Sequence, residues 1–222
     1  MNRFAVIVAG GTGQRFGSPV PKQFLLLNGK PVLMHSIEKF SRLCKTVVVV
    51  LPYNFLNDWE AVCRQFKFEV PHLIAVGGAS RSLSVLNGLN KIEEDGMVAI
   101  HDAARPLVSE ALIDKVFSHG EKTGNAVPCI RLSDSIRILN GKESKSVNRD
   151  DFRLIQTPQC FSLSELKKVF RKFAGEEFTD EASLMEKYGI AINLVDGEYF
   201  NIKITGKTDL AHAEILFNQK HV

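Results

Sequence analysis

The apolar run Phe4-Ala-Val-Ile-Val-Ala9 leads directly into a glycine-rich segment, Gly10-Gly-Thr-Gly-Gln-Arg15-Phe-Gly17. A short, continuous apolar run is typical of a parallel strand that is buried on both faces. The glycines let the backbone of the following loop approach a ligand closely. No acidic residue occurs before Glu38, whereas Arg15 and Lys22 are positively charged. Backbone amides combined with unopposed positive charge predict a loop that binds polyphosphate.

Strand-like and helix-like segments alternate along the rest of the chain. Runs rich in β-branched residues predict strands at residues 46–51, 73–76, 97–100, 126–130 and 191–195. Amphipathic stretches predict helices near residues 32–43, 55–67, 81–94, 110–121, 163–173, 180–188 and 208–219. This alternation indicates an α/β fold with a doubly wound sheet, in which ligands bind beyond the carboxyl ends of the strands.

Three of the expected helices begin with residues that favour a helix start. Ser109 and Thr179 each precede acidic residues and are expected to be N-caps. Ser162 and Glu165 have the spacing of a capping box. These positions predict where the helices begin.

Residues 132–150 interrupt the alternation. Residues 132–139 (LSDSIRIL) alternate polar and apolar side chains, and Asn140-Gly141 separates them from a second such run at 144–147. This pattern predicts a β-hairpin with its turn at Asn140-Gly141. Because an isolated two-stranded hairpin is marginally stable, it must pack on a second copy of the chain or on its own domain. We expect one domain, residues 1–222, with an arm at about 132–150.

Composition excludes several classes of protein. The net charge of +3 is too small to indicate binding of nucleic acid or of a membrane surface. No apolar run reaches the roughly 18 residues that a transmembrane helix needs, and the first run is too short for a signal peptide. The four cysteines lack metal-binding spacing. Together these features predict a cytoplasmic protein with reduced cysteines.

The glycine loop matches neither of two common nucleotide-binding motifs. Phe16 stands where a dinucleotide fingerprint has its third glycine, and no Gly-Lys-Ser or Gly-Lys-Thr closes the loop as in a P-loop. Arg15 offers a planar fork to phosphate oxygens, and Pro21 stiffens the segment that carries Lys22. The alternative for the loop is a tight turn that binds no ligand, and the alternative for Lys22 is a solvated surface lysine.

A second motif is Ile100-His-Asp-Ala-Ala-Arg-Pro106, in which Asp102 directly follows an expected strand. A carboxylate beside a phosphate site requires a cation between them, and Mg²⁺ commonly binds one or two carboxylates together with substrate phosphates. The alternatives for Asp102 are an N-cap and an ion pair with Arg105. His101 is expected to be a packed residue rather than a catalyst.

Two further segments carry residues that could contact a ligand. Gly77-Gly-Ala-Ser-Arg-Ser-Leu-Ser84 joins a strand to a helix, and its small hydroxyl side chains and backbone groups could contact a base. Asn201-Ile-Lys-Ile-Thr205 is expected to be a late strand that carries the cation Lys203. Taken alone, the first segment is also consistent with a plain helix entrance, and the second with a lysine on a sheet edge.

Seven segments, in the same order, resemble the 2-C-methyl-D-erythritol 4-phosphate cytidylyltransferases of isoprenoid precursor synthesis. They are AGGTGQRFG, PKQF, GGASRSLSV, HDAARP, QTPQ, TDEAS and NIKIT. The resemblance implies a Rossmann-like, mixed but mainly parallel sheet and a homodimer with exchanged β-arms. It implies transfer of CMP from CTP to 2-C-methyl-D-erythritol 4-phosphate, with Mg²⁺ present and with 4-diphosphocytidyl-2-C-methyl-D-erythritol and pyrophosphate as products.

The resemblance also implies roles for individual residues. The catalytic cations would be Arg15, Lys22 and Lys203, and the carboxylate associated with the metal would be Asp102. The nucleotide would contact Ala9, Gly10, Gly11, Thr12, Gly13, Gly78, Ser84, Ala103 and Arg105. The sugar phosphate would contact Ser135, Arg149 and Thr179, with Arg149 supplied by the arm of the partner.

Two residues depart from the pattern of the family. Ala79 replaces an acidic residue that is common in the cytidine site, so contacts to the base there would come from the backbone or be missing. Gly10 replaces the usual alanine and is more typical of the related ribitol-5-phosphate cytidylyltransferases. HDAARP and TDEAS favour methylerythritol phosphate as the acceptor. A ribitol-5-phosphate cytidylyltransferase and a non-catalytic nucleotide-binding regulatory protein are the alternatives.

Overall fold

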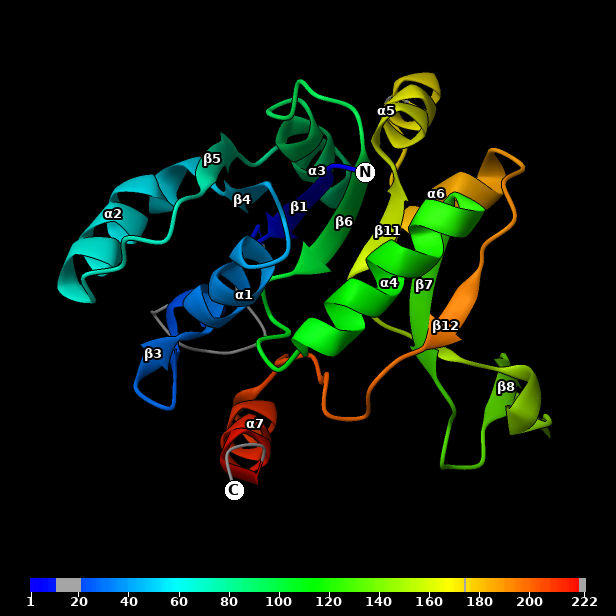
Figure 1. Ribbon diagram of the computed structural model, residues 1–222. Helices are drawn as coiled ribbons and strands as arrows, with labels where there is room; N and C mark the ends of the chain where they lie inside the picture. The colour runs from blue at the N-terminus through cyan, green and yellow to red at the C-terminus, as the bar shows by residue number, and fades with distance from the viewer. Residues whose placement is uncertain (11–20, 174, 220–222) are drawn as a thin grey trace.

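The computed structural model describes residues 1–10, 21–173 and 175–219, except for the side chain of Lys22. Its centre is an eight-stranded sheet with the order β10-β7-β11-β6-β1-β4-β5, and β12 pairs with β7 (Figure 1). The strands are β1 (Arg3–Val8), β4 (Thr46–Leu51), β5 (Leu73–Val76), β6 (Met97–Asp102), β7 (Asn125–Ile130), β10 (Leu154–Ile155), β11 (Gln159–Ser162) and β12 (Leu194–Asp196).

The described helices alternate with these strands. The α-helices are α1 (Val32–Ser41), α2 (Leu56–Gln65), α3 (Arg81–Leu89), α4 (Glu110–Thr123), α5 (Leu163–Lys172), α6 (Glu181–Lys187) and α7 (Lys207–Gln219). The 3₁₀ helices are η2 (Lys22–Phe24), η3 (Tyr53–Phe55) and η4 (Arg149–Asp151). A small pair of strands, β2 (Leu26–Leu27) and β3 (Lys30–Pro31), precedes α1.

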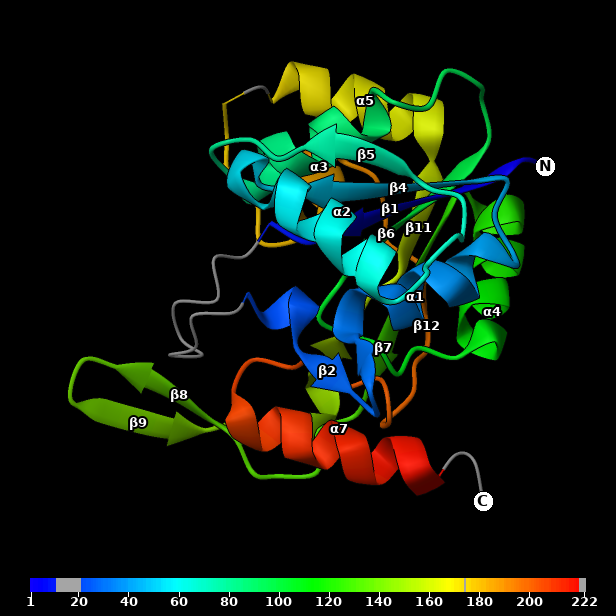
Figure 2. The ribbon, with the colours of Figure 1, turned by 90° about the vertical axis from the view of Figure 1, so that its left-hand side faces the viewer.

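Both faces of the sheet are covered. Alternate side chains of β1 point to opposite faces, so Ala5 and Ile7 enter one core and Phe4 and Val6 enter the other. Helices α1, α2 and α4 complete the first core, and α3, α5 and α6 complete the second. Figure 2 shows α5 and α3 above the strands and α1 below them. The expected doubly wound α/β fold is confirmed.

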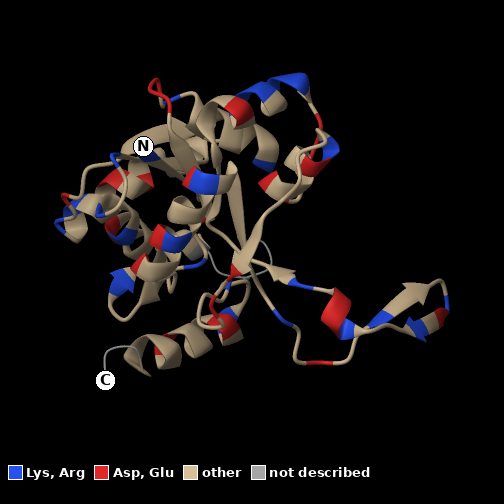
Figure 3. Cartoon of the chain, turned by 45° about the vertical axis from the view of Figure 1, so that its right-hand side comes forward, with Lys and Arg blue, Asp and Glu red and all other residues tan. Residues whose placement is uncertain are grey.

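The sheet is mixed and mainly parallel at its centre. Strand β1 pairs in parallel with β4 and β6, and β5 pairs in parallel with β4. The strands that the sequence did not predict are antiparallel: β11 lies between β6 and β7, and β10 borders β7. Figure 3 shows the strands of the sheet mostly free of charged residues, which lie on the helices, the loops and the hairpin.

Of the three predicted helix caps, one is confirmed and two are wrong. Ser109 caps α4 by accepting a hydrogen bond from the backbone of Leu112, as predicted. Asp180, rather than Thr179, caps α6, because its carboxylate accepts from the Ser183 backbone. Ser162 makes no capping hydrogen bond, and its hydroxyl instead pairs with that of Ser164.

The predicted hairpin is present and exposed. Strands β8 (Arg137–Asn140) and β9 (Glu143–Ser146) are antiparallel, and all eight of their residues are exposed. Asn140 pairs with Glu143, so the two-residue turn is Gly141-Lys142, one position later than expected. The positive φ of Gly141, +60°, suits such a turn. Figure 2 shows the hairpin projecting from the body of the protein.

Candidate active site

A cavity of about 280 Å³ lies at the carboxyl ends of β1 and β6. It is where a doubly wound sheet is expected to bind its ligand. The predicted site residues that line it are Ala9, Gly10, Gly78, Ser84, Asp102, Ala103 and Lys203. These residues come from four separate segments of the chain. The alternation of strands and helices therefore brings together motifs that are far apart in the sequence.

Three positively charged side chains surround the carboxylate of Asp102 in this cavity. Its carboxylate lies 2.8 Å from Nζ of Lys203, 3.7 Å from Nε of Arg105 and 4.0 Å from Nη2 of Arg81. Burial raises the pKa of Asp102, but the charges of Lys203 and Arg81 lower it more, and the resulting pKa is about 2. The carboxylate is therefore ionised at neutral pH.

Lys203 reaches the cavity from the C-terminal part of the chain. The expected strand at residues 201–205 is wrong, because this segment pairs with no neighbouring strand in the described structure. Instead, the backbone of Ile204 donates to the carbonyl of Ala104 at 2.8 Å, and Nδ2 of Asn201 donates to the carbonyl of Thr157 at 2.8 Å. These bonds hold Lys203 beside the loop that follows β6.

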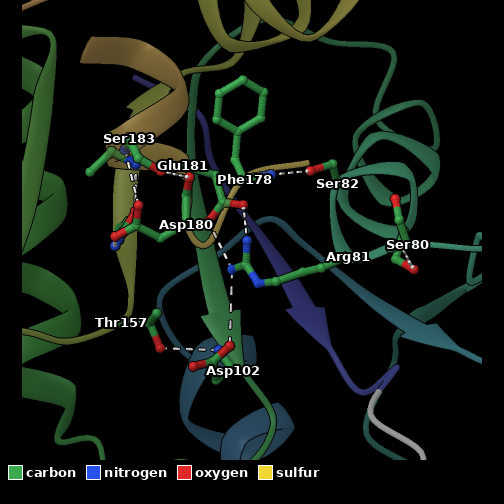
Figure 4. Close-up of polar contacts among 12 residues, drawn as sticks. Ser80, Arg81, Ser82, Asp102, Thr157, Phe178, Asp180, Glu181 and Ser183 are labelled. Carbon is green, nitrogen blue, oxygen red and sulfur yellow. Dashed lines mark hydrogen bonds and ion pairs between the residues drawn. The ribbon is translucent and has the colours of Figure 1, made fainter. Parts of the chain in front are cut away.

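Arg81 connects the cavity to α6 (Figure 4). Its guanidinium donates to both carboxylate oxygens of Glu181, at 2.6 and 3.0 Å, and Glu181 is only 1% exposed. The neighbouring Asp180 accepts a hydrogen bond from Gln159 at 3.0 Å. The segment that follows Thr179 is thus tied to the start of α3.

Ser84 shapes the turn that precedes α3. Its hydroxyl accepts from the backbone of Gly78 at 3.0 Å and donates to the carbonyl of Ser80 at 2.7 Å. A Cβ atom on Gly78 would lie 2.3 Å from Cγ of Leu83, so a side chain at this position would force α3 to shift. Packing therefore requires glycine at position 78, and no side chain covers the backbone at this point of the cavity wall.

His101 is structural, as the sequence indicated. It is fully buried, with Nδ1 3.1 Å from the Thr157 hydroxyl and Nε2 3.2 Å from the carbonyl of Arg105. Burial lowers its pKa to about 3, so the ring is neutral at pH 7. A neutral, enclosed imidazole with partners on both nitrogens supports the turn after β6 rather than exchanging protons with a ligand.

Some predicted residues lie elsewhere in the described chain. The side chain of Arg105 faces the carbonyl of Asn201, at 2.7 Å, and is not part of the cavity wall. Arg149 is exposed in η4, where it donates to the carbonyl of Ser133. Ser135, near the hairpin, and Thr179 also lie outside the lining.

The remaining predicted site residues belong to the glycine-rich loop and to the segment that follows it. Gly11, Thr12, Gly13 and Arg15 lie outside the described residues, as does the side chain of Lys22. Their predicted roles stay predictions.

Sequence reasoning missed part of the cavity wall. Gln23, Ser80, Arg81 and Ala104 line the cavity without having been assigned a role. Each lies inside or next to a motif that was singled out, so proximity to Lys22, Gly78 or Asp102 was the available signal. The sequence does not show which side chains of a motif turn inward.

The side chains of the cavity wall fit a metal ion that is bound partly by the protein and partly by a phosphate-containing ligand. Among the residues that the structure describes, no three His, Cys, Asp or Glu side chains form a metal-binding group. Asp102 is a single ionised carboxylate in the cavity wall, which matches the preference of Mg²⁺ for one or two carboxylates plus phosphate oxygens.

None of the helices in residues 1–10, 21–173 and 175–219 has the length and apolar character needed to cross a bilayer.

Comparisons with known proteins match this chain over nearly its full length. The model of the 2-C-methyl-D-erythritol 4-phosphate cytidylyltransferase family matches residues 4–219. The protein of that name from Bacteroides fragilis is 41% identical over 97% of this chain and 100% of its own length. The crystal structure of the enzyme of that name from Thermus thermophilus has a TM-score of 0.80 at 30% identity, covering 96% and 98% of the two chains.

A second solved structure, 4-diphosphocytidyl-2C-methyl-D-erythritol synthase from Anaerococcus prevotii, has a TM-score of 0.84 at 26% identity and covers 98% of both chains. The resemblance seen in seven short motifs thus extends over the full fold, and residues of five of those motifs line the cavity. The chain belongs to the 2-C-methyl-D-erythritol 4-phosphate cytidylyltransferase family.

Proposed function

We propose that the protein transfers CMP from CTP to 2-C-methyl-D-erythritol 4-phosphate, which yields 4-diphosphocytidyl-2-C-methyl-D-erythritol and pyrophosphate. Membership of the family supplies the identity of the substrates. The observation that supports the chemistry is the pairing of Lys203 with the ionised Asp102 in a cavity at the carboxyl ends of β1 and β6.

The reaction is an in-line displacement. An oxygen of the acceptor phosphate attacks the α-phosphorus of CTP, the bond from that phosphorus to the bridging oxygen breaks, and pyrophosphate leaves with the electron pair. The acceptor phosphate is already ionised at pH 7, so no general base is required. This agrees with the state of His101, the neighbour of Asp102 in the sequence, which is buried and neutral. Positioning and charge stabilisation provide the catalysis.

Three cations carry the charge stabilisation in this proposal. Lys203 lines the cavity, and Arg15 and Lys22 are assigned to the same phosphates from the glycine loop. Asp102 keeps Lys203 in place and would hold Mg²⁺ together with the nucleotide phosphates. When bound, Mg²⁺ offsets the negative charge of phosphate oxygens.

The nucleotide is assigned to the side of the cavity bounded by α3. Ala9, Gly10 and Ala103 are small, and Gly78 has no side chain to cover the backbone of its turn, which a base could contact. Arg105 contributes indirectly, because it holds the carbonyl of Asn201 near Lys203. Gly11, Thr12 and Gly13 are assigned to the triphosphate.

The acceptor site is proposed to be completed by a second copy of the chain. Arg149 and Ser135 lie next to an exposed hairpin and outside the cavity of their own chain, whereas Thr179 precedes the α6 segment that Arg81 holds. An exchanged arm would bring Arg149 to the partner's acceptor phosphate.

Mixing two inactive variants tests this exchange. Arg149→Ala and Lys203→Met chains are each expected to be inactive, but a mixed dimer would have one complete site. Mixing should therefore restore about a quarter of wild-type turnover when chains associate at random in a two-fold dimer. No recovery would show that Arg149 serves its own chain or no site.

The acceptor and nucleotide are tested directly by pyrophosphate release. The assay pairs each of the four nucleoside triphosphates with methylerythritol phosphate and with ribitol 5-phosphate. Release is expected with CTP and methylerythritol phosphate. Faster release with ribitol 5-phosphate would favour the alternative suggested by Gly10, and CTP binding without release would favour a regulatory protein.

A further inference from the structure

Gln23 carries a buried carboxamide that has no hydrogen-bond partner in the described part of the chain. The residue lies in η2 and is 1% exposed, and neither Nε2 nor Oε1 has a partner among the described residues. An unpaired buried amide costs free energy, because it loses the hydrogen bonds that it makes with water in the unfolded chain. Such groups are rare in native proteins, and a missing ligand is one of the reasons for them.

Gln23 belongs to the wall of the candidate active-site cavity. The other described residues that have buried, unpartnered side-chain atoms lie outside the cavity lining; they are Ser36, Arg105, Glu198 and Asn201. Gln23 is also the one described residue in this group with two unpaired side-chain atoms, Nε2 and Oε1. The position of the unpaired amide therefore coincides with the place where substrate must bind.

Packing holds Gln23 in this position. The ring of the next residue, Phe24, stacks on Trp59 with centroids 5.9 Å apart and meets Phe55 edge-on at 6.1 Å. The backbone of Phe24 also donates to the carbonyl of Pro21 at 2.9 Å. Because Phe24 is anchored in the core that α1 and α2 cover, Gln23 reaches the cavity from the opposite face of the sheet to α3.

The donor and acceptor atoms of the carboxamide limit which ligand groups could pair with both of them. Nε2 donates hydrogen bonds and Oε1 accepts them. Ionised phosphate oxygens only accept, so a phosphate would satisfy Nε2 and leave Oε1 buried without a partner. A hydroxyl group both donates and accepts, and both substrates of the proposed reaction carry hydroxyls.

We propose that Gln23 binds a substrate hydroxyl through its carboxamide, as a specificity contact that adds to the charged groups of the site. The proposal rests on the proposed function. The hydroxyl belongs either to the ribose of the nucleotide or to the polyol of the acceptor.

Gln23→Met tests the proposal, because methionine has a similar shape and no amide. Gln156→Met is the matched control: Gln156 is also buried, at 4% exposed, but its Nε2 donates to the carbonyl of Glu198 at 2.8 Å and its Oε1 accepts from the Glu198 backbone at 3.1 Å. Gln23→Met is expected to keep or raise the Tm of the ligand-free protein, whereas Gln156→Met lowers it.

In steady-state kinetics, Gln23→Met is expected to raise the KM of one substrate at least tenfold. A rise for CTP that disappears when 2′-deoxy-CTP or 3′-deoxy-CTP replaces CTP identifies the ribose as the source. A rise confined to methylerythritol phosphate identifies the polyol.

Three results would overturn the proposal: a Tm lowered as far as in Gln156→Met, both KM values within twofold of wild type, or a loss in kcat with both KM values unchanged. Each would show that the amide is satisfied by something other than substrate. The wild-type protein is assayed in parallel, so absence of pyrophosphate release by wild type would instead contradict the proposed function.

Discussion

The ammonium group of Lys203 lies 2.8 Å from the carboxylate of Asp102, although the two residues come from distant parts of the chain. The pair places a cation in the cavity wall beside an ionised acid. Binding of phosphate would give Lys203 a second anionic partner.

Lys203→Met is expected to lower kcat by about 10²–10³, the usual cost of removing a group that stabilises developing charge. The fold should remain intact, because Arg81 and Arg105 still balance Asp102. Single-turnover kinetics measure the effect, with Lys207→Met, an exposed lysine at the start of α7, as the control. A rate within threefold of wild type would remove Lys203 from the proposed mechanism.

The Arg81–Glu181 pair should contribute strongly to stability. Arg81→Met leaves the buried Glu181 carboxylate without its partner, which typically costs about 3–5 kcal/mol in the free energy of unfolding. Urea denaturation measures this loss. The control is Arg64→Met, which breaks an exposed pair with Glu60 at 3.5 Å and should change stability by less than about 1 kcal/mol.

The double variant Arg81→Met/Glu181→Leu separates charge from packing. It should recover part of the lost stability, because no unpaired buried charge remains. Equal losses in the single and double variants would mean that the contribution of the pair is not electrostatic.

His101 should make the free energy of unfolding depend on pH. The low pKa of its buried ring determines the sign of this dependence. The folded protein keeps His101 neutral down to about pH 3, whereas the unfolded chain takes up a proton below about 6.5. Stability is therefore lost as the pH falls below 6.5, by up to about 1.4 kcal/mol per pH unit. Between pH 6.5 and 5, His101→Gln should flatten the pH dependence of the urea midpoint. Parallel profiles for both proteins would contradict this account.

Magnesium should bind with the nucleotide rather than before it. Asp102 is one carboxylate, and the described residues offer no three-ligand group, so the protein alone should show no Mg²⁺ binding tighter than millimolar in calorimetry. With CTP present, binding should appear, and chelation by EDTA should abolish turnover. Asp102→Asn should raise the Mg²⁺ concentration needed for half-maximal rate, whereas Asp58→Asn on α2 should not. Tight binding without CTP would contradict this order.

The central strands could be predicted from local sequence, but the antiparallel ones could not. Strands β1 and β4 are continuous apolar runs because both of their faces are buried. Strand β11 has polar residues at both ends and follows a proline, and it forms because β6 and β7 supply partners on either side. Such pairing depends on tertiary context more than on propensity.

In the candidate site, too, some features could be predicted from local sequence and others depend on tertiary contacts. Asp102 and Gly78 could be placed together because each lies at the carboxyl end of a parallel strand, and the carboxyl ends of such strands share one edge. The bond between Arg81 and Glu181 could not be foreseen, because a charged residue at a helix start is usually solvated. The unpaired amide of Gln23 was equally hidden, because burial is a property of the assembled fold.

The hairpin of β8 and β9 has a consequence for handling the protein. Its turn contains Lys142, and the adjacent Leu139 is 75% exposed, so the tip offers trypsin an accessible peptide bond. A second chain that covers this tip would shield it. Cleavage at Lys142 should then slow as the protein is concentrated, which provides a measure of chain association that needs neither substrate nor metal.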